Sequence, residues 1–291
     1  MLRKLVLAIS VAVLIPSLAR AAEEPVPVPD AKVVRCAVIG GMTMTGLWQA
    51  LTKRFEAQSD YRIQVVATGP RPVLDEAFRA GKADFLTMHS GDITTNLVAD
   101  GYGINMRPWT RNDLVIVGPE SDPAGIAGMK DGAAALRRIA ETHSNFVDLE
   151  DAGGREMAHM LWKRSGIKPE GEWLLQDGSK GDHQQLRFAE EHSAYLIVGR
   201  MPVINGKLAR AEHMKIVVDQ DPTMRRPYNV MEANPEKVPG VNSAGARALS
   251  DFLLSDETQR FLLTYTTQVY TKQPGVPLFY PVRQVAQPKS K

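Results

Sequence analysis

Short apolar runs alternate with amphipathic segments along most of the chain. The runs at 33–39 (VVRCAVI) and 63–69 (IQVVATG) are rich in β-branched residues and predict strands, whereas apolar residues at helical spacing predict a helix at about 45–58. Pro72 suits the first turn of a second helix, and Gly81 suits its end. By the same criteria, further strands are predicted at 83–90, 113–119, 145–149, 172–178, 194–198, 214–219 and 227–234, and further helices at 92–101, 129–143, 154–166, 182–192, 242–255 and 256–269. Strands that alternate with helices predict the α/β class.

The alternation restarts after the strand at 113–119, which gives the chain two α/β units. The segments that join the units, at 113–119 and 225–234, are themselves apolar and strand-like. We therefore predict a two-lobed fold in which each lobe is a mixed sheet flanked by helices and two hinge strands join the lobes. Lobe 1 comprises 33–115 with 229–291, and lobe 2 comprises 116–228. Ligands of open α/β sheets bind beyond the carboxyl ends of the strands, so the predicted site is the cleft between the lobes.

The first residues have the pattern of a secretory signal peptide. The basic start MLRK precedes an apolar run at 5–14 that is too short to span a bilayer stably, and the ARA at 19–21 has the small residues that signal peptidase needs. We predict a signal peptide at 1–21 and a proline-rich extended leader at 22–32. The sequence therefore predicts a periplasmic location.

The charge balance argues against a nucleic-acid partner. The formal net charge of the whole chain is +2; without Arg3, Lys4 and Arg20, 32 of the 35 basic residues remain and face 33 acidic ones. Nucleic-acid binding requires a concentrated basic surface, which a nearly neutral chain does not provide. Cys36 is the single cysteine, so no intrachain disulfide can form, and its place inside an apolar run predicts a buried side chain.

Glycines stand at three predicted strand–helix junctions. These are Gly40-Gly41, His89-Ser90-Gly91 and Gly153-Gly154. The backbone N–H groups of a helix start favour an anion, so three such starts at one cleft predict an anion site. Side chains near the junctions that add hydrogen-bond donors are Thr43, Thr45, Ser90, Arg71 and Arg155. The threonines could instead cap a helix, and the arginines could instead lie on the surface.

Long fragments of the chain resemble a known family. They are ADGYGINMRPWTRND, DLVIVGPESDPAGIAGMKDGAAALRRIA, LWKRSGIKPEGEWLL and DPTMRRPYNVMEANPEKVPGVNSAGARAL, and the closing helices follow them. In content and order they resemble the tungstate-type periplasmic solute-binding proteins over almost all of 33–265. The resemblance implies a type II periplasmic-binding-protein fold that closes by a hinge. It also implies a small anionic ligand of the tungstate or molybdate kind, and delivery to an ABC-transporter permease in the inner membrane.

The ligand loops of that family map onto definite positions of this chain. A hydroxyl-rich loop before the first helix corresponds to 38–42 (VIGGM), and a second loop with arginine, serine and threonine corresponds to 148–154 (DLEDAGG). The hydroxyls are absent here, and three acids stand in the second loop. An arginine after the strand at 194–198 is kept as Arg200. The predicted ligand-binding residues are Gly41, Met42, Thr43, Arg71, Ser90, Gly153, Gly154, Arg155 and Arg200.

The residues leave other ligands and roles open. Side chains near the predicted cleft that suit a soft metal ion such as Cu(I), or an apolar organic anion, are Met42, Met44, Met88, His89, Met157, His159 and Met160. A binding or sensor module that has lost transport is a further alternative. The motifs of serine hydrolases, zinc proteases and P-loop enzymes are absent from the sequence. We predict no enzyme, no cofactor and no bound metal, and we expect a monomer.

Overall fold

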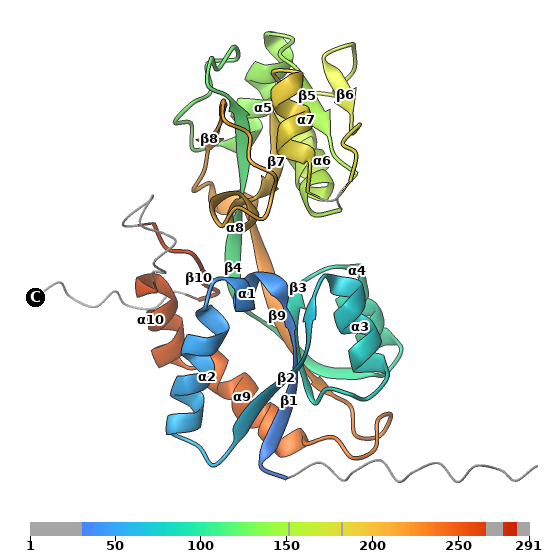
Figure 1. Ribbon diagram of the computed structural model, residues 1–291. Helices are drawn as coiled ribbons and strands as arrows, with labels where there is room; N and C mark the ends of the chain where they lie inside the picture. The colour runs from blue at the N-terminus through green and yellow to red at the C-terminus, as the bar shows by residue number, and fades with distance from the viewer. Residues whose placement is uncertain (1–30, 151, 182, 266–275, 284–291) are drawn as a thin grey trace, which may run out of the picture.

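The computed structural model describes residues 31–150, 152–181, 183–265 and 276–283. The predicted signal peptide and nearly all of the predicted leader lie outside these residues. Figure 1 shows two lobes, one above the other, joined by two strands that run between them. The fold is the mixed α/β, two-lobed arrangement that the alternation of elements predicts.

Lobe 1 is a sheet with the strand order β10-β4-β9-β3-β1-β2. The strands that it does not share with lobe 2 are β1 (Val33–Ile39), β2 (Arg62–Gly69), β3 (Phe85–His89) and β10 (Tyr280–Pro281). Strand β1 pairs parallel with β2 and β3, whereas β9 and β10 pair antiparallel with their neighbours. The helices are α1 (Gly40–Met44), α2 (Leu47–Ala57), α3 (Arg71–Arg79), α4 (Asp92–Ala99), α9 (Ser243–Leu254) and α10 (Asp256–Thr264). In Figure 1, α2, α9 and α10 lie on one side of this sheet and α3 and α4 on the other.

Lobe 2 is smaller and is built around the far half of β4. Its strands are β5 (Phe146–Asp148), β6 (Leu174–Gln176), β7 (Leu196–Gly199) and β8 (Met214–Val218). Its helices are α5 (Gly132–Glu141), α6 (Ala152–Ser165), α7 (Gln185–Glu191), α8 (Arg200–Ile204) and the 3₁₀ turn η1 (Pro222–Met224). Strands β7 and β8 pair antiparallel with β4, and β5 pairs parallel with β6.

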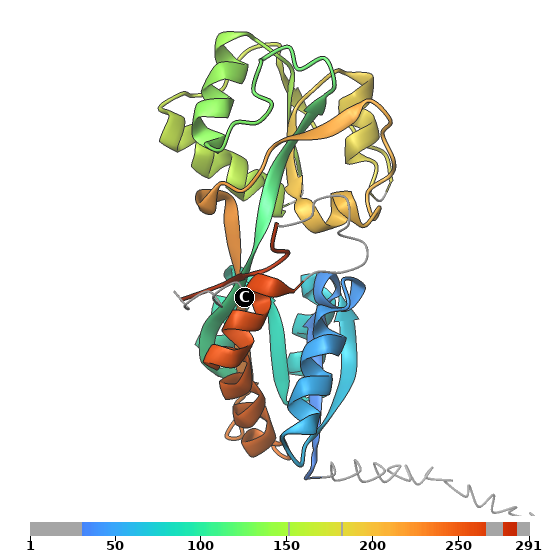
Figure 2. The ribbon, with the colours of Figure 1, turned by 90° about the vertical axis from the view of Figure 1, so that its left-hand side faces the viewer.

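Two strands cross between the lobes, β4 (Gly103–Pro119) and β9 (Arg225–Ala233). Up to Asp113, β4 pairs antiparallel with β9, and from Leu114 it pairs with β7. This change of partner between neighbouring residues marks the hinge, which Figure 2 shows from the side. Strand β4 begins earlier than predicted. The prediction missed its first part because Asn105, at φ 54°, and Pro108 interrupt the apolar pattern. In the sheet, two register shifts against β9 accommodate these residues.

Each lobe has its own apolar core. The core of lobe 1 includes Cys36, fully buried as its apolar neighbours predict, and that of lobe 2 is divided between the two faces of its sheet. Met201 of α8 belongs to lobe 2 by sequence but packs into the core of lobe 1. The lobes are therefore in direct contact beside the hinge. None of the helices in the described part of the chain is long and apolar enough to cross a membrane.

The segment Gly40–Met44 is a short helix, not the loop that its glycines predict. The hydroxyl of Thr43 donates to the carbonyl of Gly40 at 3.0 Å, and that of Thr45 donates to the carbonyl of Gly41 at 2.9 Å. These bonds reach back into the preceding turn, so neither threonine caps the next helix. Gly46 occupies the cap position before α2, at φ 76°, which suits a residue without a Cβ.

Candidate functional site

A cavity of about 240 Å³ lies between the two lobes at the hinge. Residues at or just after the ends of β1, β2, β3 and β7 line it, as expected for the carboxyl ends of sheet strands. From lobe 1 and the crossing strands come Ile39, Gly40, Gly41, Met44, Gly69, Pro70, Arg71, His89, Asn112, Arg226 and Tyr228. From lobe 2 come Gly153, Gly199, Met201, Pro202 and Lys207. The cavity is therefore shared by both lobes and the strands between them.

The side chains around this cleft carry an excess of positive charge. Arg71, Lys207 and Arg226 line it, and within the described ranges no aspartate, glutamate, serine or threonine does. Two acids of the segment 148–154, Asp148 and Glu150, do not line it: Asp148 lies 3.8 Å from the imidazole of His159, and Glu150 is exposed. Residue 151 lies outside the described residues. The repulsion that Asp148 and Glu150 would exert on an anion is therefore weakened by distance and solvent.

Arg71 is the first residue of α3, and its guanidinium lies against the start of α4. A Cβ atom at Gly91 would stand only 2.7 Å from Nη1 of Arg71, so the glycine allows the close approach. The nearest acid, Asp92, is 3.8 Å from Nη1, and this buried nitrogen makes no hydrogen bond with any described residue. A buried donor without an acceptor costs free energy, which a bound anion would recover.

Arg226 lies on β9 just past the hinge, and its guanidinium rests on Gly153 of lobe 2. A Cβ at Gly153 would overlap the guanidinium. Gly153 belongs to the first turn of α6, a helix of 14 residues. The positive end of a helix dipole repels a cation, so Arg226 and the start of α6 oppose each other. An anion that contacts both would be attracted by both.

His89 and Tyr228 form an aromatic wall of the cleft, with ring centroids 4.3 Å apart. Burial lowers the pKa of His89 well below its usual value, and the charges of Arg226 and Arg71 lower it further. The imidazole is therefore neutral at pH 7. Burial also raises the pKa of Tyr228 far above its usual range. The hydroxyl of Tyr228 and Oδ1 of Asn112 are buried and make no hydrogen bond of normal geometry with the described residues, although the side chain of Asn112 lies close enough to Tyr228 to lower the pKa of its hydroxyl.

Comparisons with known proteins agree with this architecture. The family model of the bacterial extracellular solute-binding proteins matches residues 36–265. The chain belongs to this family.

Relatives of this solute-binding protein are found among characterised sequences and solved structures. The tungstate-binding protein TupA of Peptoclostridium acidaminophilum is 30% identical over 240 residues, which are 81% of each chain. The structure of TupA from Desulfovibrio alaskensis G20 is similar with a TM-score of 0.71 at 25% identity, over 87% of this chain and 99% of that one. A structure titled as the tungstate ABC transporter from Geobacter sulfurreducens has a TM-score of 0.65 at 29% identity, over 80% of this chain and 99% of that one. This solute-binding protein therefore has the type II periplasmic-binding-protein fold that the resemblance implies.

Three of the residues predicted from the sequence lie together in the cleft of this solute-binding protein. Gly41, Arg71 and Gly153 all line the cavity, although they come from different lobes. Gly41 also lies at the contact between the lobes, since a Cβ there would stand 3.1 Å from the methyl carbon of Met201. The fold therefore brings together these three positions, which were predicted because they lie near the ends of predicted strands.

The other predicted residues do not line the cavity in this conformation. Met42 is fully buried in the core of lobe 1, and the hydroxyl of Thr43 contacts that of Thr68 at 3.1 Å. The amide of Ser90 donates to the carbonyl of Pro227. A Cβ at Gly154 would overlap the carbonyl of Ile197, so this glycine allows α6 to pack on β7, and Arg155 is exposed.

Arg200 is buried in the hinge and pairs with Asp113. Its Nη1 atom is 3.2 Å from Oδ2 of Asp113, and both side chains are almost completely buried. Asp113 also receives the hydroxyl of Tyr280 at 2.9 Å and the guanidinium of Arg225 at 3.3 Å. Burial raises the pKa of Asp113, whereas Tyr280, Arg200 and Arg225 each lower it. This cluster connects α8, both crossing strands and the C-terminal strand β10.

The sequence did not indicate four of the polar residues that line the cleft, namely Asn112, Lys207, Arg226 and Tyr228. All but Lys207 lie in fragments that resemble the family, on the crossing strands next to the hinge. A signal was therefore present, because polar residues on a strand that joins two lobes are candidates for the ligand site. Lys207 follows α8 in a segment without a distinctive pattern.

The methionine and histidine positions are divided between the cleft and the core, and Met44 and His89 line the cleft. Met42 and Met88 are buried in the core, whereas Met44 and Met160 are exposed by 40% and 38%. No group of three histidine, cysteine or acidic side chains that could hold a metal ion occurs within the described ranges.

Proposed function

We propose that this solute-binding protein captures a small oxyanion in the cleft between its lobes and delivers it to an ABC-transporter permease. The observation that carries the proposal is the charge of the lining: Arg71, Lys207 and Arg226 meet there, and no carboxylate of the described residues lines the cavity. An arginine holds oxyanions through charge-assisted hydrogen bonds, which are about twice as strong as neutral ones.

The names of the relatives support this proposal and indicate which ion to test first. Tungstate is the ligand named for the relatives from Peptoclostridium and Desulfovibrio. The predicted signal peptide and the family of extracellular solute-binding proteins both favour a periplasmic location. No serine or threonine of the described part of the chain lines the cavity, so charged donors take the place of hydroxyls there.

Binding would act through the hinge. Arg71 belongs to lobe 1, Arg226 to a crossing strand, and Lys207 to lobe 2. An anion that contacts all three is held best when the lobes approach, so it shifts the population toward the closed form. A permease that recognises the closed form would receive only loaded protein. The protein acts by binding and release, and we propose no catalysis.

Thermal unfolding with added anions tests the proposal. Tungstate, molybdate, sulfate and phosphate are each added to the purified mature protein at low salt, and the melting temperature is recorded. An anion at about 100 times its dissociation constant stabilises the native state by roughly 2.7 kcal/mol. A rise in melting temperature with at least one oxyanion is expected, and no rise with any of them would contradict the proposal.

Matched variants locate the site. Arg71→Gln and Arg226→Gln each remove a charged donor, which should weaken binding by roughly tenfold to a hundredfold. Arg155→Gln is the control because Arg155 is exposed and lies outside the cavity lining. If all three variants bind the anion as the parent protein does, the ion is not held in this cleft. The same assay on Arg200→Met tests the ligand role that the resemblance implies for Arg200.

A further inference from the structure

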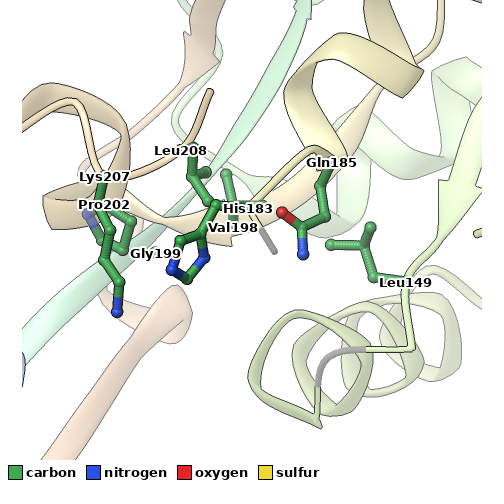
Figure 3. A pocket seen from close by; sticks show the side chains of 8 residues that line it. All are labelled: Leu149, His183, Gln185, Val198, Gly199, Pro202, Lys207 and Leu208. Carbon is green, nitrogen blue, oxygen red and sulfur yellow. The ribbon is translucent and has the colours of Figure 1, made fainter. Parts of the chain in front are cut away.

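A second cavity lies beside the cleft, in lobe 2. This cavity, here called the annex, has a volume of about 150 Å³. Its lining residues, drawn in Figure 3, are Leu149, His183, Gln185, Val198, Gly199, Pro202, Lys207 and Leu208. Gly199, Pro202 and Lys207 also line the cleft. The two cavities are therefore neighbours that share one wall.

The annex is independent of the hinge. All its lining residues belong to lobe 2, on both sides of β7 and α8. A rigid rotation of the lobes narrows the cleft, because the cleft has walls from both lobes, but it leaves the annex unchanged. The annex therefore persists in the closed, loaded form.

The walls of the annex do not suit an inorganic oxyanion. Leu149 is 3% exposed and Val198 is 7% exposed, and with Pro202 and Leu208 they give the annex an apolar surface. Atom Oε1 of Gln185 is buried and makes no hydrogen bond with any described residue. In Figure 3 the amide of Gln185 lies between Leu149 and the ring of His183. An unpaired buried acceptor requires a donor, which tungstate or sulfate does not offer.

The charges of the annex restrict what that donor can be. Lys207 lines the annex, and none of the described acids does, so the charge of Lys207 would repel a ligand ammonium group. A hydroxyl group is neutral and can both donate and accept, so it satisfies the amide of Gln185 in either orientation. The apolar walls then suit the carbon atoms that carry the hydroxyl.

The sizes of the cavities lead to the same conclusion. Pockets for small organic ligands begin at roughly 300 Å³. The cleft or the annex alone is smaller than this, whereas the two together exceed it.

We infer that the ligand of this protein is a small hydroxylated organic anion. Its acid group lies at Arg71 and Arg226, and its carbon chain extends past Lys207 so that a hydroxyl reaches Gln185 in the annex. The inference rests on the proposed function, because it places the acid group at the proposed oxyanion site. It adds that the oxyanion is a group of a larger molecule.

Calorimetric titration of the mature protein with a series of carboxylates tests the inference. The probes are the ω-hydroxy acids from glycolate to 6-hydroxyhexanoate, the unsubstituted acids from acetate to hexanoate, and sodium tungstate and phosphate. At one chain length, the hydroxy acid should bind about fivefold more tightly than its unsubstituted partner, as expected for one neutral hydrogen bond. The inference would be overturned if affinity depended neither on the chain length of the acid nor on the presence of the hydroxyl group.

Two variants of the annex sharpen the test. Gln185→Leu should abolish the preference for the hydroxy acid, and Leu208→Phe should weaken the longer acids by roughly tenfold because it fills the annex. Both variants should bind glycolate and any inorganic oxyanion as the parent protein does. Gln176→Leu, on an exposed residue of the same lobe, is the control and should change nothing.

The outcomes separate this inference from the proposed function. If tungstate or phosphate binds and no organic acid does, the oxyanion site stands and the annex plays no part in binding. If a hydroxy acid binds but Gln185→Leu and Leu208→Phe leave its affinity unchanged, the annex assignment is wrong. If no probe binds, both proposals fail.

Discussion

The guanidinium of Arg226 lies directly on Gly153, where any side chain would displace it. Arg226 is on the crossing strand β9, and Gly153 is in the first turn of α6 in lobe 2. The pair thus connects the hinge to the lobe that closes. A glycine inside a helix is unfavourable for stability, so the absence of a side chain at this position serves the placement of the arginine.

Gly153→Ala should separate stability from binding. Alanine favours the helix by up to about 1 kcal/mol, and the displaced group is the end of a flexible side chain, so the melting temperature should stay the same or rise. The affinity for the anion should fall by roughly tenfold because the guanidinium moves away. Thermal unfolding and calorimetric titration measure the two effects.

Gly154→Ala is the matched control for this pair. Its new methyl group would overlap the backbone carbonyl of Ile197, which cannot move aside. This variant should therefore lose about 1–3 kcal/mol of stability from overpacking. Equal melting temperatures for the two alanine variants would contradict the assignment of different roles to the two glycines.

The stability of the protein should fall as the pH drops below about 6.5, in part because of His89. The folded state holds the pKa of His89 below its ordinary value of 6.5, so the unfolded chain takes up the proton first. The contribution of neutral His89 to stability is complete above pH 6.5 and is lost as the pH falls toward the folded-state pKa. Through His89, the free energy of unfolding should change by at most about 1.4 kcal/mol per pH unit.

His89→Gln measures this contribution by chemical denaturation at several pH values. Between pH 6.5 and 5, the free energy of unfolding of the variant should fall less steeply than that of the parent protein. Bound anion should also raise the pKa of His89, because it offsets the charges of Arg226 and Arg71; NMR titration of the imidazole detects this. If the pH dependence of stability is the same in the variant and the parent protein, and if the anion leaves the NMR titration of His89 unchanged, His89 does not lie next to the ligand.

The tyrosines of the cleft and the hinge should respond differently to loss of the hydroxyl. The hydroxyl of Tyr228 makes no hydrogen bond of normal geometry with the described residues, so Tyr228→Phe should leave the stability of the empty protein unchanged or raise it. The same variant should weaken anion binding. Tyr280→Phe removes the bond to Asp113 and should cost about 1.5–3 kcal/mol. Urea unfolding of both variants tests the contrast, which equal losses would refute.

The pair of Arg200 and Asp113 should behave as one structural unit. Asp113→Leu removes the carboxylate that Arg200 and Arg225 share and should cost about 3–5 kcal/mol, whereas Arg200→Met leaves Asp113 paired with Arg225 and should cost less. The double variant should cost less than the sum, because it removes both charges. A double-mutant cycle by urea unfolding measures the difference. Strict additivity would show that the two side chains are not coupled.

The sequence alone determined the alternation of strands and helices, the two lobes and the family. These features depend on local periodicity and on long matching fragments, which a chain carries without reference to its fold. The strand ends also predicted Gly41, Arg71 and Gly153 at the cleft, because the carboxyl ends of sheet strands meet there.

The tertiary structure alone decided which charges face the ligand. Arg226 and Arg200 both lie near the hinge, yet Arg226 lines the cleft and Arg200 does not. The difference arises because Asp113 on β4 binds Arg200, while the register of β9 places Arg226 over Gly153. Both contacts join residues more than 70 positions apart, so they depend on the packing of the lobes and not on any local pattern.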